Sequence, residues 1–159
     1  MFYVLIIIAT FFAMEFVAWA MHKYVMHGFM WKVHEDHHVR DDTPFEKNDL
    51  FFLIFAIPSW LCIMFGNMYG STNTAAIGWG ILVYGIAYTF IHEIVIHQRI
   101  KWFTRTNNPY LRAIRKAHKV HHKKLWREDG ECFGMLVVPW KYFREAIQYK
   151  RKQKAAGQH

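Results

Sequence analysis

The hydrophobic positions of this chain fall into three long runs separated by polar segments. Residues 2–21 form one run, in which Glu15 is the only charged residue, and residues 50–66 and 74–91 form two more. A helix of about 20 residues, rising about 1.5 Å per residue, spans a hydrocarbon core about 30 Å thick. The pattern therefore predicts transmembrane helices over about 2–21, 50–66 and 74–91.

The second and third runs are expected to pack against each other as a hairpin. Residues 67–73 between them are rich in turn-forming residues and hold no charge. Small residues in the third run suit close helix contact in lipid. They are Ala75, Ala76, Gly78, Gly80, Gly85 and Ala87.

Composition and charge place the chain in a membrane. Its 159 residues are 53% hydrophobic and 18% aromatic, which indicates a single membrane-embedded domain over 1–159. Sixteen of the twenty Lys and Arg residues follow position 98, and the turn at 67–73 holds none. The positive-inside rule then puts the N-terminus and that turn outside, and segments 22–49 and 92–159 in the cytoplasm. No nucleic-acid-binding module is visible, so the net charge of +8 is better explained by topology and anionic lipid.

Ten of the eleven histidines repeat one pattern twice, H-x4-H followed by H-x2-H-H. Neutral imidazole is the commonest side-chain ligand for transition metals, and ten are too many for one ion. We expect a dinuclear centre with about five histidines for each ion, one half-pattern coming from each half of the chain. His159 stands outside the pattern and is expected to be disordered. The predicted ligands are His22, His27, His34, His37, His38, His92, His97, His118, His121 and His122.

Helical geometry suggests how these histidines divide. Positions i, i+3 and i+4 share one face of an α-helix, whereas adjacent residues diverge by about 100°. His37 and His38 are therefore expected to reach different ions, as are His121 and His122. In H-x4-H the two residues lie about 140° apart on an α-helix, so each such pair is expected to lean toward two ions.

Two carboxylates are candidates for a supporting catalytic role. Glu93 follows His92 near the end of a span, and Glu15 lies inside the first span, where an acid is costly unless it faces protein. Hydrogen bonding to a metal-bound imidazole is the expected role of both. For Glu15, a hydrogen bond between helices remains an equal alternative. Asn108-Pro109 is predicted to cap a helix that carries the last three histidines.

Several segments resemble the bacterial β-carotene hydroxylases of the membrane-bound fatty acid hydroxylase superfamily. They are HKYVMH at 22–27, HEDHH at 34–38, FEKNDL at 45–50, HEIVIHQR at 92–99, AHKVHH at 117–122 and ECFGMLVVP at 131–139. The resemblance implies an all-α integral membrane protein of the bacterial inner membrane, with about three transmembrane helices and cytoplasmic helices enclosing the dinuclear site. Relatives often carry aspartate where this chain has Glu93, which leaves the role of that residue open.

The activity implied by the resemblance is that of a non-haem di-iron monooxygenase. Such an enzyme hydroxylates carbon 3 of the β-ionone rings, converting β-carotene to β-cryptoxanthin and then zeaxanthin, with dioxygen and electrons from a ferredoxin-type donor. The same nitrogens would also accept zinc. Three alternatives stay open: a fatty acyl or sterol hydroxylase, a carotenoid ketolase, and a metal-binding membrane protein without catalysis.

Overall fold

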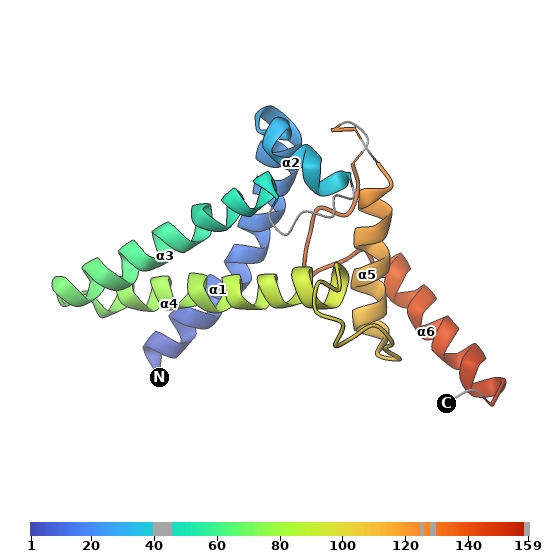
Figure 1. The fold of residues 1–159 in the computed structure, drawn as a ribbon. Coiled ribbons are helices and arrows are strands. Elements are labelled where there is room, and N and C mark those ends of the chain that lie inside the picture. The colour runs from blue at the N-terminus through green and yellow to red at the C-terminus, as the bar shows by residue number, and fades with distance from the viewer. Residues whose placement is uncertain (40–45, 125, 128–129, 158–159) are drawn as a thin grey trace.

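A computed structural model of the chain describes residues 1–39, 46–124, 126–127 and 130–157, and their regular structure is all helical (Figure 1). His159 lies outside the described residues. The elements are α1 (Phe2–Ala20), η1 (Met21–Phe29), α2 (Trp31–His38), η2 (Lys47–Leu50), α3 (Phe51–Met68), α4 (Thr72–Thr89), η3 (Phe90–Ile96), α5 (Pro109–His122) and α6 (Trp140–Ala155).

Three helical stretches are long and apolar enough to cross a membrane, as the hydrophobic runs predict. They cover Phe2–Phe29, Lys47–Met68 and Thr72–Ile96. All three exceed the predicted bounds, and the first and third extend furthest because α1 and α4 continue without a break into η1 and η3. Only a minority of the residues in these spans are buried, as expected for helices that meet lipid.

Glycines allow the spans to pack closely. A Cβ added at Gly66 would lie 2.5 Å from the backbone nitrogen of Ala75, so α3 and α4 touch there nearly backbone to backbone. A Cβ at Gly80 would lie 2.5 Å from Cβ of Thr10, which marks the crossing of α4 and α1. Close approach through small residues is the usual means of helix association in lipid. The expected contact role of the small residues in 74–91 is confirmed at these positions.

Beyond the spans, α5 and α6 pack on each other through Ala113, Ala117, Tyr142 and Ala146. The predicted start of α5 is confirmed, because the side chain of Asn108 accepts a hydrogen bond from the backbone nitrogen of Tyr110 at 2.9 Å. The ends of α1, α3 and α4 that lead into the histidine segments meet near α2 and α5 (Figure 1). The fold thus gathers all four histidine segments at one end of the membrane-spanning helices.

Candidate metal centre

Both H-x4-H pairs lie on π-helical turns. In η1 the backbone nitrogen of Met30 donates to the carbonyl of Val25, and in η3 that of His97 donates to the carbonyl of His92. These hydrogen bonds connect residues i and i−5, and π-helical turns are rare and frequent at functional sites. In such a turn, residue i+5 returns over residue i, as residue i+4 does in an α-helix.

The π-helical turns correct one expectation from the sequence. His22 and His27 do not lean toward two ions, because their ring nitrogens enter the same cluster. The rings of His92 and His97 also stay together, with centroids 4.5 Å apart. The expected divergence assumed an α-helix, and the wider turn removes it.

The ten histidines form two adjacent groups, and eight of the ten are buried. In each group, one ring nitrogen per residue lies within 4.8 Å of all the others. The first histidine group is His22, His27, His34, His38 and His121. The second histidine group is His37, His97, His118 and His122, and His92 adjoins it with its Nε2 atom 3.0 Å from that of His37.

The adjacent histidines separate as predicted. His38 belongs to the first group and His37 to the second, while His121 and His122 divide in the same manner. The two groups share a wall, where the rings of His38 and His122 stack with centroids 4.7 Å apart. His37, from the first half of the chain, joins the second group, and His121, from the second half, joins the first group. Neither group therefore comes from one half of the chain alone.

Hydrogen bonds on the outer nitrogens orient seven of the ten rings. A ring nitrogen facing a carbonyl, amide or carboxylate oxygen must carry the proton, because that oxygen only accepts. Four rings donate from Nδ1 to backbone carbonyls: His22 to Phe133, His27 to Arg127, His38 to Lys124 and His121 to Glu131. Three rings donate from Nδ1 to side-chain oxygens: His34 to Asn48, His37 to Glu46 and His92 to Glu93.

This arrangement turns bare lone pairs toward one another inside each group. A neutral imidazole carries a single proton, so Nε2 of these seven rings is a lone pair. Yet Nε2 of His34 lies 3.2 Å from Nε2 of both His22 and His38. Nε2 of His27 likewise lies 3.2 Å from Nε2 of His121. Facing lone pairs repel unless a cation lies between them. Two nitrogens bound to one ion at about 2.1 Å would lie roughly 3.0–3.4 Å apart, so the residues present fit a metal.

Electrostatics keeps the rings neutral, as metal ligands must be. Burial, together with the neighbouring His27, lowers the pKa of His38 to about 4. Burial and the nearby His92 lower the pKa of His97 to about 3, and burial lowers that of His121 to about 3. Near neutral pH these imidazoles therefore offer lone pairs instead of repelling a cation.

Glu93 forms a hydrogen bond to the imidazole of His92, and its supporting catalytic role stays a prediction. Its Oε1 accepts from Nδ1 of His92 at 2.5 Å, and its Oε2 pairs with Nε of Arg99 at 2.8 Å. Arg99 also lies 3.0 Å from Glu46, whose other oxygen accepts from Nδ1 of His37 at 2.6 Å. One guanidinium thus joins the two carboxylates that orient His37 and His92.

Glu15 makes different contacts from those expected of an imidazole partner. Its Oε2 accepts a hydrogen bond of 2.8 Å from the hydroxyl of Tyr84, which is the alternative contact between helices. Its Oε1 accepts three backbone N–H groups, those of Met135, Leu136 and Val137, at 2.9 to 3.0 Å. Glu15 therefore binds the segment between α5 and α6 to the first span.

Sequence reasoning missed Glu46 and Asn48 as partners of the histidines. Both lie in the segment 45–50, which drew notice only through its resemblance to relatives. Its composition gives no sign that it touches an imidazole, since Glu46 is nine residues from His37 and Asn48 is fourteen from His34. The backbone carbonyls that orient the other rings leave no sequence signal at all.

Comparisons with known proteins agree with the resemblance inferred from the motifs. Residues 7–144 match the fatty acid hydroxylase family. The β-carotene hydroxylase of Pantoea ananas is 36% identical over 135 residues, covering 85% of this chain and 77% of that protein. The β-carotene hydroxylase of Pseudescherichia vulneris is 37% identical over 134 residues, 84% of this chain and 76% of that protein. The chloroplastic β-carotene hydroxylase 2 of Capsicum annuum is 35% identical over 129 residues, 79% of this chain and 41% of that protein. No solved structure matches the chain significantly.

Proposed function

This chain belongs to the fatty acid hydroxylase family and is an enzyme, and we propose that it hydroxylates carbon 3 of the β-ionone rings of carotenoids. The observation that carries this proposal is the pair of adjacent histidine groups whose Nε2 lone pairs face one another. The names of the relatives supply the substrate class. In this proposal β-carotene is converted to β-cryptoxanthin and then to zeaxanthin.

The proposed cofactor is a pair of iron ions, one in each histidine group. When bound, the irons would supply the activation of dioxygen that breaking an unactivated C–H bond requires. The reaction consumes the C–H bond, one dioxygen, two electrons and two protons, and yields an alcohol and water. Imidazoles also accept zinc, so iron is chosen for the redox chemistry of the reaction and not for the donor set.

The chain's own residues would orient the ligands and limit the access of water. Burial of eight of the ten histidines keeps bulk solvent away from the two groups. Glu46 and Glu93 fix the tautomer and orientation of His37 and His92, and their shared pairing with Arg99 offsets part of their negative charge. Such outer hydrogen bonds hold ligand geometry in metal enzymes.

A membrane position suits both substrate and site. Carotenes dissolve in the bilayer, and the three candidate spans lead directly into the histidine segments. We place the site on the cytoplasmic side of a bacterial inner membrane with the N-terminus outside, because the basic residues follow the spans that end at the histidines. Reporter fusions at both ends of the chain would test this orientation.

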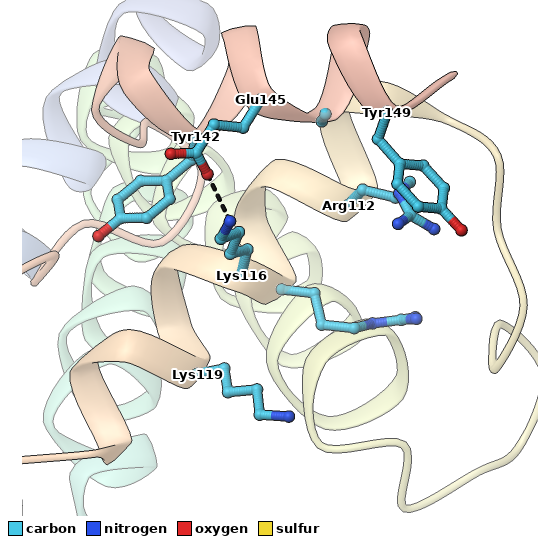
Figure 2. Close-up of a pocket in the computed structure, with 8 residues that line it drawn as sticks. Arg112, Lys116, Lys119, Tyr142, Glu145 and Tyr149 are labelled. Atoms are coloured by element: carbon cyan, nitrogen blue, oxygen red, sulfur yellow. Dashed lines mark ion pairs between the residues drawn. The ribbon is translucent and has the colours of Figure 1, made fainter. Parts of the chain in front are cut away.

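The proposed electron donor is an acidic ferredoxin-type protein, and a basic groove offers it a docking surface. The groove lies between α5 and α6 and encloses about 380 Å³. Figure 2 shows the side chains of α5 along the groove: Lys116 pairs with Glu145 of α6 at 2.5 Å, and Arg112 stacks 3.8 Å from the ring centre of Tyr149, while Lys119 has no such acidic partner drawn. The same helix carries His118, His121 and His122, so α5 connects the groove to both histidine groups.

Expression in cells that make β-carotene, followed by chromatography of the pigments, tests the proposed reaction. Wild-type chain is expected to yield hydroxylated carotenoid, and His38→Ala is expected to yield none. A keto-carotenoid or a hydroxylated lipid would instead indicate one of the other family activities. Unchanged pigment from wild-type chain that has bound both ions and receives electrons would contradict the proposal.

The docking surface is tested by reversing charge in the groove. Lys119→Glu is expected to raise the KM for a reduced ferredoxin severalfold at low salt and to leave turnover with a small-molecule reductant unchanged. Lys150→Glu makes the same change of charge on α6, outside the groove lining, and serves as the matched control. An unchanged KM for Lys119→Glu would place the donor elsewhere.

A further inference from the structure

Residues 135–137, between α5 and α6, lie against the first candidate span and are held there by Glu15. In Figure 1 this segment runs back from α5 toward α1 before α6 begins. Backbone N–H groups of Met135, Leu136 and Val137 converge on one oxygen of Glu15, which belongs to the first span. Three successive N–H groups aimed at one point form an anion-binding nest. The hydroxyl of Tyr84 occupies the other carboxylate oxygen.

Each partner in this contact removes a cost from the other. A charged carboxylate inside a span is expensive, and non-helical backbone at that depth is tolerated only when protein satisfies its polar groups. Four hydrogen bonds to Glu15 solve both problems at once. The turn is also tight, because a Cβ on Gly134 would lie 2.5 Å from the carbonyl oxygen of Val137 and 3.3 Å from Oε1 of Glu15.

The same segment holds two histidines of the first group. The carbonyl of Phe133, two residues before the nest, accepts the Nδ1 proton of His22 at 3.0 Å. The carbonyl of Glu131 accepts that of His121 at 2.9 Å. The ring of Phe133 also packs edge-on against His22, His27 and His121, with ring centres 5.1 to 5.4 Å apart.

We infer that Glu15 is a positioning residue for the first histidine group, acting through segment 131–137. The nest fixes residues 135–137, the tight turn at Gly134 transmits that position, and the carbonyls of Phe133 and Glu131 then set the rings of His22 and His121. This inference rests on the proposed metal centre. It predicts an effect on the first group and none on the second, whose orienting partners Glu46 and Glu93 lie elsewhere.

The test measures bound iron(II) per chain and the affinity of each ion, on full-length protein purified in detergent without oxygen. Glu15→Met keeps the side-chain length and removes every acceptor. It is expected to lower the affinity of the first group for its ion about 10- to 100-fold, the usual cost of losing orienting partners. At limiting metal, one bound ion per chain should therefore remain. Glu15→Gln keeps an acceptor oxygen and is expected to retain two ions.

Paired substitutions identify which ion is lost. Adding His122→Ala, in the second group, to Glu15→Met should leave no tightly bound ion, whereas adding His38→Ala, in the first group, should leave one. Tyr84→Phe removes the hydroxyl partner but leaves the nest, and it serves as the control that keeps both ions. Gly134→Ala disturbs the turn from the other side and should reproduce the selective loss, so it decides the question if Glu15→Met does not fold.

Hydrogen exchange at residues 135–137 provides a reading independent of metal and activity. We expect these amides to be protected in the wild type and to exchange faster in Glu15→Met. Faster exchange with both ions still bound normally would overturn the inference, as would equal loss of both ions from a variant with wild-type helix content. Failure of the wild type to bind two ions would instead refute the proposed metal centre itself.

Discussion

Replacing Glu46 by alanine should selectively weaken the second histidine group. The carboxylate accepts from Nδ1 of His37 at 2.6 Å and pairs with Arg99 at 3.0 Å, and its side chain is only 15% exposed. Its loss leaves the buried N–H of His37 without its acceptor and the ring free to turn. Hydrogen bonds to charged groups contribute about 1.5–3 kcal/mol, and about 1.36 kcal/mol corresponds to a factor of ten. The expected loss in affinity for the second ion is therefore roughly 10- to 150-fold.

Competition with a chelator, followed for each ion in detergent-purified protein, measures this loss. The ion of the first group should keep its affinity, because Asn48 and backbone carbonyls orient that group. Glu46→Gln retains an acceptor oxygen and should lose less than tenfold. Glu35→Ala is the matched control, since Glu35 lies on α2 beside the histidines and forms no hydrogen bond or ion pair with an imidazole among the described residues. An affinity for the second ion within twofold of wild type in Glu46→Ala would refute the reasoning.

Three further predictions concern ligands, packing and pH. His38→Ala and His122→Ala should each lower bound metal from two ions to about one and abolish hydroxylation, and metal analysis showing two ions in either would contradict the assigned grouping. Gly78→Ala should destabilise the helix hairpin by about 1–3 kcal/mol, because its Cβ would lie 2.8 Å from the carbonyl oxygen of Ser59. Thermal unfolding should show no such loss for Gly85→Ala, where the added Cβ meets nothing within 4 Å. The metal-free protein should lose stability as pH falls from about 6.5 toward 4. Burial lowers the pKa of His38 in the folded state to about 4, whereas the same side chain in the unfolded chain takes up its proton near 6.5. Equal melting temperatures at pH 7 and pH 5 would contradict this.

Local features of the fold were predictable from the sequence because short-range rules determine them. Three apolar runs gave three candidate spans, and Asn108 followed by Pro109 gave the start of α5. Ala75, Gly78 and Gly80 marked where α4 meets its neighbours, whereas Gly85 makes no such close contact. Each of these predictions needs only hydropathy, side-chain size or capping chemistry within a few residues.

The π-helical turns were not predicted, because periodicity arguments assume 3.6 residues per turn. A spacing of five places two histidines on divergent faces of an α-helix, and this led to the wrong expectation for His22 and His27. The partners of the rings were equally hidden. Residue Phe133 is 111 positions from His22, and Glu15 is 120 positions from Met135, so only the tertiary fold brings each pair together.

The division of adjacent histidines has a consequence for how the site assembles. Because His37 joins a group otherwise drawn from the second half of the chain, and His121 joins one drawn from the first half, α2 and α5 meet through these rings. Ring nitrogens of α2 and α5 lie within 4.8 Å of one another in both groups, those of His38 and His121 in the first and those of His37 and His122 in the second. Neutral rings that turn lone pairs toward one site would push these helices apart, whereas a cation bound by rings of both helices would pull them together. The free energy of metal binding is therefore also free energy for docking α2 onto α5, and the two helices should separate most readily when the ions are removed.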